Sequence, residues 1–207
     1  MSVHHFHIGA FNGAPDELVT MMAARLIEEM ARRDPLTHAH SERVARVAAG
    51  IGEELHLSAH DLEDLHTGAM LHDIGKIAVS GTLLSKTERL SKGEFARVKS
   101  HTEMGYELLS NVPGLERFAP VARWHHERWD GTGYPDRKRL EDAPLHSRIV
   151  ALADSVDVML HGRHYQTARD PREVILEVRR SSGSHFDPIV VNGLMSAWMG
   201  GLLPGFD

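Results

Sequence analysis

The chain has 207 residues, of which 16 are histidine and none is cysteine. The absence of cysteine excludes disulfide frameworks, thiolate metal sites and cysteine nucleophiles, so any metal must be held by imidazole and carboxylate groups. The formal net charge of −6 offers no basic excess for a nucleic acid polymer, and no apolar run is long enough to span a membrane. We therefore expect a soluble, cytoplasmic globular protein with neither kind of partner.

Hydrophobic periodicity predicts an all-α fold, because no convincing alternating strand pattern occurs. After a tail over residues 1–14, a helix begins at Pro15, repeats an apolar residue every four positions and ends at the Asp34-Pro35 step. Later helices are predicted over residues 38–55, 58–69, 91–109, 145–160, 170–182 and 188–200. Between the third and fourth of these, Pro113 and Pro120 bracket short helical turns, and a helix then runs into His125-His126.

Two segments are predicted to lack regular helices. Residues 71–90 indicate a long loop, and residues 129–144 are rich in turn-forming glycine and proline. No repeat or internal linker is visible, which favours a single compact helical domain over residues 15–207.

Histidine and aspartate recur on successive predicted elements, and this combination is stronger evidence for a metal site than any single histidine. Asp154 lies in an otherwise apolar helix, where a carboxylate is costly to bury unless it is paired or bound to a metal; a salt bridge or a solvent-facing turn is the alternative. Helical bundles build metal sites from groups on several helices. Seven candidate ligands suit two octahedral ions that share Asp73, namely His40, His72, Asp73, His101, His125, His126 and Asp154.

These residues lie in segments that resemble the HD-GYP subgroup of the HD-superfamily metallophosphohydrolases. The matching segments follow the family's order and spacing from about Asp34 to Val191, and comprise residues 37–44, 71–77, 99–105, 125–135, 151–154 and 182–188. The most specific of them reads His125-His126-Glu127-Arg128-Trp129-Asp130-Gly131-Thr132-Gly133-Tyr134-Pro135. The resemblance implies a helical bundle of the HD-domain type that carries a GYP loop.

The resemblance further implies a metal-dependent phosphodiesterase that hydrolyses the bacterial second messenger cyclic di-GMP to pGpG or GMP. By position, the seven candidate ligands would hold the metal ions, and Asp73 and Lys76 would be the catalytic residues. The implied substrate contacts are Lys76, Arg163, Gly131, Gly133, Tyr134 and Pro135. Two ions can clamp a phosphodiester and lower the pKa of a bridging water, Lys76 adds a point cation, and Arg163 can hold a phosphate bidentately. For Tyr134, packing of the loop is the alternative.

Some positions depart from the family pattern. Leu36 stands where some members have a glutamate ligand for a third metal, so we expect two divalent ions, iron or manganese, with nickel, cobalt and zinc as alternatives. Gln166 replaces a common basic residue, and residues 136–140 differ from the usual turn. These changes leave two alternatives open: a non-catalytic cyclic di-GMP receptor, and an HD phosphohydrolase acting on another cyclic dinucleotide or nucleotide. A homodimer or a signalling-protein partner is also compatible with the sequence.

Overall fold

The helices follow one another along the chain, with one long loop between Trp124 and Leu140. The computed structural model describes residues 15–162 and 168–203. The first half contains α1 (Pro15–Arg33), α2 (Pro35–Glu54), α3 (Ala59–Leu71), the 3-10 helix η1 (Ile74–Ala78), α4 (Gly81–Leu84), α5 (Lys92–Lys99) and α6 (His101–Ser110). The second half contains η2 (Glu116–Phe118), α7 (Ala119–Trp124), η3 (Leu140–Asp142), α8 (Leu145–His161), α9 (Pro171–Arg180) and α10 (Pro188–Met199).

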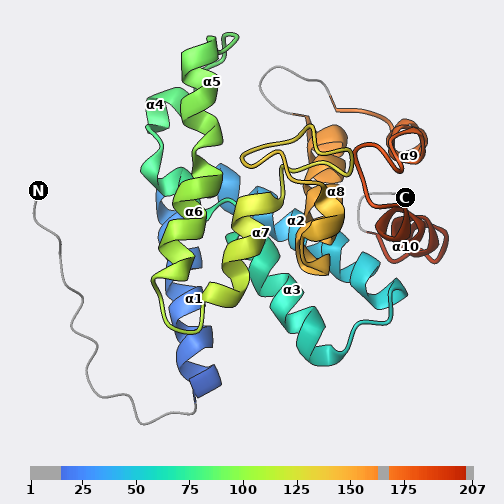
Figure 1. Ribbon diagram of the computed structural model, residues 1–207, viewed down its shortest axis with the longest axis horizontal. Coiled ribbons are helices and arrows are strands. Elements are labelled where there is room, and N and C mark those ends of the chain that lie inside the picture. The colour runs from blue at the N-terminus through green and yellow to red at the C-terminus, as the bar shows by residue number, and fades with distance from the viewer. Residues whose placement is uncertain (1–14, 163–167, 204–207) are drawn as a thin grey trace, which may run out of the picture.

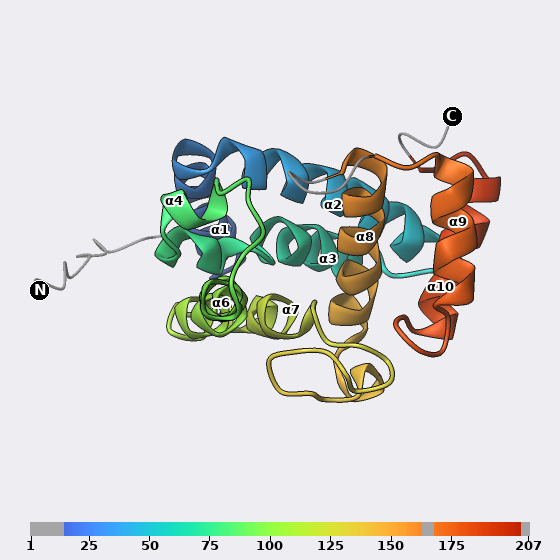
Figure 2. The same ribbon diagram turned by 90° about the horizontal axis from the view of Figure 1, so that it is seen from above.

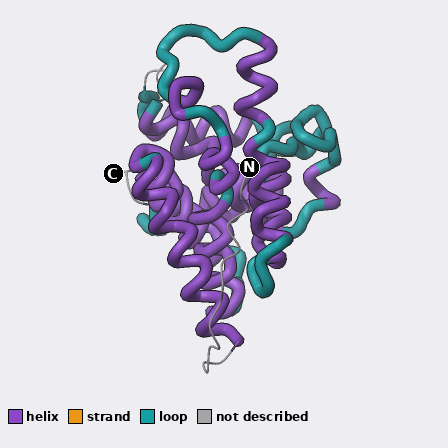
Figure 3. The backbone as a smooth tube through the Cα atoms, turned by 90° about the vertical axis from the view of Figure 1, so that its left-hand side faces the viewer, coloured by secondary structure: helices purple, strands orange, loops and turns teal. Residues whose placement is uncertain are grey.

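The predicted all-α class is confirmed. Within the described ranges the backbone forms helices and loops, and extended pairing is limited to two isolated bridges, Arg128 with Arg139 and Ser182 with Phe186 (Figure 3). In the same ranges no helix is both long and apolar enough to cross a membrane.

Side-chain caps start several helices where the sequence predicts them. The Ser58 hydroxyl accepts the backbone N–H of Asp61, and Ser91 and Glu94 form a reciprocal capping box. Asp187 caps α10, with proline at the first helical position. These bonds satisfy N–H groups that have no partner inside the helix.

Three boundaries differ from the prediction. The second helix begins at Pro35 rather than residue 38, because the Asp34 carboxylate accepts the Thr37 N–H at 3.0 Å and caps it. The predicted loop over 71–90 contains η1 and α4. The predicted helix over 91–109 is two helices, because side chains after the break bond to carbonyls of α5: His101 Nδ1 lies 2.6 Å from the Val98 oxygen, and the Thr102 hydroxyl bonds to Lys99 at 3.0 Å.

Two apolar clusters make up most of the core and meet at α3. One joins α2, α3, α8, α9 and α10 around Leu65 and Leu152, and the other joins α1, η1, α6 and α7 around Leu71 and Ile74. In Figures 1 and 2, α9 and α10 lie together at one end of the molecule, and α1 and α6 lie toward the other. The C-terminal end of α3 therefore lies where the two halves of the bundle meet.

Gly75 allows η1 to pack directly on α6. A Cβ atom at this position would lie 1.9 Å from the carbonyl oxygen of His101 and 2.5 Å from the backbone nitrogen of Gly105. Only a residue without a side chain permits this approach, which brings Asp73 beside His101.

We predict that Gly75→Ala destabilises the domain by at least about 3 kcal/mol, because backbone rather than a flexible side chain stands in the way. For a domain of this size the melting temperature should fall by about 6–12 °C. Gly93→Ala is the matched control, since a Cβ atom there meets nothing within 4 Å and alanine favours the helix. Thermal unfolding followed by circular dichroism measures both; equal melting temperatures would contradict the packing argument.

Candidate metal centre

All seven predicted ligands converge on one centre. His40 projects from α2, His72 and Asp73 follow α3, and His101 is the first residue of α6. His125 and His126 follow α7, and Asp154 lies in α8. Six of these side chains are buried, and the seventh, His126, retains partial exposure.

Asp73 is shared by two groups of ligands. One group comprises Asp73, His101, His125 and His126; the other comprises His40, His72 and Asp73, and within each group the ligand atoms lie within 4.8 Å of one another. The two oxygens divide between the groups. Asp73 Oδ1 lies 3.2 Å from His101 Nε2 and 3.8 Å from His125 Nε2, whereas Oδ2 lies 3.3 Å from His72 Nε2 and 3.9 Å from His40 Nε2.

Asp154 makes a second link between the groups. Its Oδ1 lies 3.0 Å from His40 Nε2, and its Oδ2 lies 3.8 Å from His126 Nδ1. The buried carboxylate that the sequence singles out on α8 therefore faces one histidine from each group.

Backbone carbonyls set the orientation of three imidazoles. In each ring Nδ1 bonds to a carbonyl of the preceding helix, which leaves the lone pair on Nε2 pointing into the centre. These contacts are His72 to Ala69 at 2.6 Å, His101 to Val98 at 2.6 Å and His125 to Val121 at 3.1 Å.

The spacing of the donor atoms suits bound cations better than hydrogen bonds between the side chains. His101 Nε2 and His125 Nε2, both acceptors in these tautomers, lie only 3.3 Å apart. The buried atoms His40 Nε2, His72 Nε2 and Asp73 Oδ1 have no hydrogen-bond partner among the described residues. Adjacent ligands of an ion at about 2.1 Å are separated by about 3 Å, so these spacings fit divalent metals held by nitrogen and oxygen.

Burial and charge place three of the predicted ligands in metal-binding protonation states, whereas the carboxylates of Asp154 and Asp157 outweigh burial at His40 and raise its pKa to about 9. Burial lowers the pKa of His126 to about 3 and that of His125 well below its ordinary value, so both rings are neutral. Burial alone would raise the pKa of Asp73, but the Lys76 ammonium together with His72 and His101 outweighs burial and holds this pKa well below the usual range. The carboxyl group is therefore ionised and available to a cation.

Lys76 lies at the edge of the centre. Its ammonium group forms an ion pair with Asp73 Oδ2, and its side chain is largely buried. The structure thus places this predicted residue against the shared ligand, within reach of a group bound beside it.

Asp157 is a residue of the site that the sequence reasoning missed. Its Oδ2 lies 2.7 Å from His40 Nδ1, and its Oδ1 accepts from Arg43 Nε at 2.7 Å. The available signal was its position three residues after Asp154 in an apolar helix, which puts both carboxylates on one face. Burial disfavours the carboxylate, but His40 and Arg43 lower the pKa of Asp157, which keeps it ionised.

The loop that follows His126 and contains Gly133-Tyr134-Pro135, here called the GYP loop, packs against the centre at His126. The Tyr134 ring stacks on His126 with centroids 4.8 Å apart, and the Tyr134 N–H donates to the His126 carbonyl at 3.2 Å. A Cβ atom on Gly133 would lie 2.5 Å from Glu127 Cα, so the loop requires glycine there. Gly131 adopts a φ of 75°, which also favours glycine.

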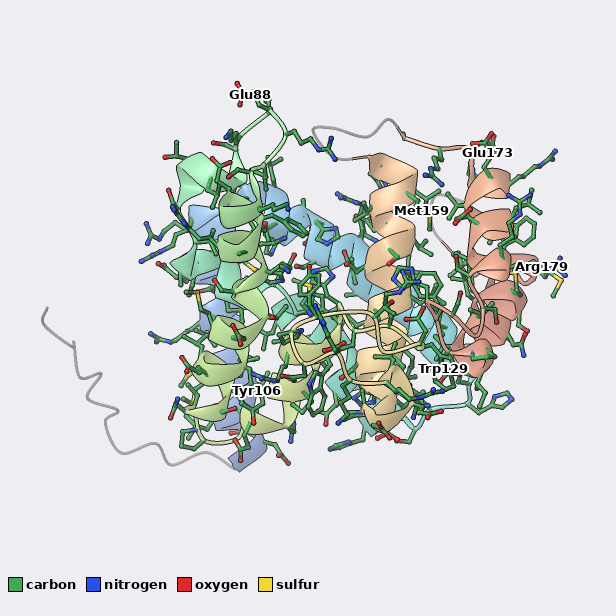
Figure 4. All side chains as sticks on the ribbon, turned by 45° about the horizontal axis from the view of Figure 1, so that its top comes forward. Glu88, Tyr106, Trp129, Met159, Glu173 and Arg179 are labelled. Atoms are coloured by element: carbon green, nitrogen blue, oxygen red, sulfur yellow. The ribbon has the colours of Figure 1, made fainter. Side chains whose placement is uncertain are left out.

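A pocket of about 490 Å³ opens beside these residues, between the loop, α8 and α9. Its walls include His125, His126, Asp154, Gly133 and Tyr134. Gly131 and Pro135, also predicted as substrate contacts, shape the loop without lining this pocket. In Figure 4, Met159, another lining residue, lies between α8 and α9.

Two other sequence predictions have different outcomes. Arg163, the expected phosphate contact, lies outside the described residues, as does Gln166. Leu36 is 73% exposed near the start of α2, and its side chain offers no atom that could hold a third metal ion.

Comparison with known proteins identifies the family. The HD domain family matches residues 24–190. The chain belongs to the HD domain family. The resemblance to its HD-GYP subgroup is confirmed by curated relatives, among them a protein of Thermotoga maritima named a cyclic di-GMP phosphodiesterase. That relative is 39% identical over 165 residues, which cover 79% of this chain and 45% of the relative.

Further similarities extend along most of this HD domain. A Vibrio cholerae protein named 3'3'-cGAMP-specific phosphodiesterase 2 is 31% identical over 177 residues, covering 84% of this chain and 33% of that protein. The chain thus spans less than half the length of these relatives. The solved structure of Bd1817, an HDG"Y"P protein of Bdellovibrio bacteriovorus, shares the fold with a TM-score of 0.65 at 17% identity and covers 90% of this chain and 61% of that structure's chain.

We predict that Asp157→Asn weakens metal binding by about 10–100-fold, because the amide no longer holds the His40 ring and its tautomer with a full negative charge. Metal content after extensive dialysis, measured by elemental analysis, and the metal affinity measured by calorimetry test this. Asp142→Asn, an exposed substitution in η3, serves as the control. Unchanged affinity in folded Asp157→Asn would show that Asp157 does not position His40.

Proposed function

We propose that this chain is a phosphodiesterase that hydrolyses cyclic di-GMP to pGpG or GMP with two divalent ions bound at the His-Asp centre. The observation that supports it most directly is Asp73, whose two oxygens face two separate groups of histidines. A carboxylate between two ligand groups is suited to bridging a pair of ions, and paired ions are a recurrent arrangement for cleaving phosphodiesters.

The residues around the centre have distinct tasks in this proposal. When bound, two ions would lower the pKa of a water molecule and neutralise charge on the phosphate. Lys76 exchanges part of its ion pair with Asp73 for a phosphate oxygen and stabilises the negative charge that develops there. Tyr134, stacked on His126, forms part of the wall of the pocket that would hold the dinucleotide.

Iron or manganese is the proposed pair of ions. Five imidazoles with two carboxylates form a nitrogen-rich, thiolate-free donor set that both metals accept. Nickel, cobalt and zinc suit the same atoms, so metal content of protein purified without chelators decides between them. The same proposal includes three further points: Arg163 contacts a phosphate, the catalytic domain covers residues 15–207, and the protein is cytoplasmic.

A cyclic di-GMP receptor without catalysis is the second candidate, favoured by the unusual basic segment after Tyr134-Pro135. Arg137, Lys138 and Arg139 follow the loop, and the Lys138 ammonium lies 4.1 Å from the centre of the Trp124 ring. The two candidates differ in whether binding leads to a linear product.

We predict that manganese- or iron-loaded protein converts cyclic di-GMP to linear pGpG or GMP. Chromatography of the nucleotides measures this conversion. Asp73→Ala should lose both the bound metal and the activity, because both ligand groups lose their common carboxylate. Binding of cyclic di-GMP without any product, in protein that retains two ions, would favour the receptor instead.

We predict that Lys76→Met retains the metal and lowers kcat by about 10²–10³-fold, since the substitution removes one preorganised cation from the phosphate but no ligand. Elemental analysis and steady-state kinetics on the same preparation separate the two effects. If the metal were lost together with the activity, Lys76 would be needed for metal binding rather than for stabilising the phosphate.

A further inference from the structure

The pocket beside the metal centre extends well beyond the ligands. Its volume of about 490 Å³ lies in the range of small-molecule sites, about 300–1,000 Å³. His125, His126 and Asp154 are lining residues that belong to the predicted metal centre, whereas Arg128, Glu177 and His185 line the pocket outside it. We call the part of the pocket formed by Arg128, Glu177 and His185 its far end. If the ions hold a phosphate, as the proposed function requires, the attached nucleoside extends into the far end.

The far end provides a flat ring and a charged rim. His185 stacks on Phe186 with centroids 4.1 Å apart and an interplanar angle of 11°, which fixes the orientation of its ring. Burial lowers the pKa of His185 to about 4, so the ring is neutral near pH 7. A neutral aromatic ring held in this way is a platform on which a purine can stack.

Glu177 stands out among the polar groups of this end. It projects from α9 and, apart from the metal ligand Asp154, provides the only carboxylate among the described residues that line the pocket. Ser181 Oγ lies 3.5 Å from its Oε1. No lysine, arginine or histidine nitrogen of the described chain lies within ion-pair distance of this carboxylate.

Arg128 and Arg169 line the same pocket and give it the opposite charge, and Arg128 has the contacts that bear on the base. It extends from the GYP loop, with its Nε and Nη2 atoms each 3.3 Å from the Asp130 carboxylate. Those contacts are longer than usual for a charge-assisted pair, so the guanidinium can also donate to a bound ligand.

A carboxylate and a guanidinium around one flat site favour guanine over adenine. Guanine carries two neighbouring donors, N1–H and the N2 amino group, which a carboxylate accepts together, and its O6 and N7 atoms accept from arginine. Adenine has an unprotonated N1 and no N2 amino group, so its corresponding edge would direct a lone pair at the carboxylate. A polar site left unpaired in this way discriminates strongly against the analogue.

We propose, on the basis of the proposed function, that Glu177 is a specificity-determining residue that selects guanine in the cyclic dinucleotide by accepting its N1–H and N2–H hydrogen bonds. The base stacks against His185, and Arg128 donates to the opposite edge. The metal centre and the recognition of the base therefore depend on different side chains.

The test compares kcat/KM for cyclic di-GMP and cyclic di-AMP in the metal-loaded wild-type protein, Glu177→Gln and Glu177→Ala. Glutamine keeps the shape of the side chain but turns an N–H group toward a guanine donor. We expect the guanine-to-adenine ratio to fall by about tenfold or more, mainly through the KM for cyclic di-GMP. Glu173→Gln, an exposed substitution at the outer end of the same helix, should keep the wild-type ratio (Figure 4).

Equal losses with both substrates would overturn the proposal, because a carboxylate that stabilised the fold or bound a ribose hydroxyl would not distinguish the bases. Calorimetric binding of pGpG and pApA to the same proteins decides the question without turnover. If the wild-type protein hydrolysed neither cyclic dinucleotide but bound pGpG more tightly than pApA in a Glu177-dependent manner, the proposed hydrolysis would fail and the base selection would stand. If it bound both linear dinucleotides equally, the base selection would fail.

Discussion

The Nδ1-to-carbonyl contact is the interaction on which the centre depends. His72, His101 and His125 each bond to a carbonyl in the last turn of the helix before them, namely α3, α5 and α7. Each ring nitrogen bonds to a carbonyl near the C-terminal end of a helix, and the same bond turns Nε2 toward the common centre. The ligands are thereby fixed by backbone, which moves less than side chains.

Helix ends also give the centre its preference for positive charge. The C-terminal end of a helix carries a partial negative charge, and three helices end at the centre. Asp73, Asp154 and Asp157 add full negative charges, whereas the nearby cations are divided between them, Lys76 on Asp73 and Arg43 on Asp157. Arg43 neutralises the carboxylate that orients His40, and this leaves Asp73 and Asp154 as the carboxylates that face the ligand atoms of the histidines.

Residues of the site could be predicted from the sequence where the signal is local, and could not where it depends on distant residues. The seven residues of the centre could be singled out from the sequence because each lies in a short, ordered motif, and the structure brings them together. Asp157 could not be found in the same way, since its partner His40 is 117 residues away and only the packing of α8 on α2 brings them together. The prediction of a loop over residues 71–90 missed η1, a short 3-10 helix. Its glycine is required by the contact with α6, and helical periodicity carries no signal of that contact.

The arrangement separates chemistry from recognition along the chain. The predicted ligands come from α2 through α8 and are held in place by helix ends and by the close approach of Gly75 to α6. The far end of the pocket is formed by α9 and the segment at 181–186, joined to the GYP loop by the bonds of Trp129 N–H to His185 and Asp130 N–H to Ser184, both 2.9 Å. Because α9 makes no ligand contact, its pocket-facing residues can change without disturbing the ions. Under the proposed function, such a domain can keep one phosphodiester chemistry while a few substitutions on a single helix alter the base that it accepts.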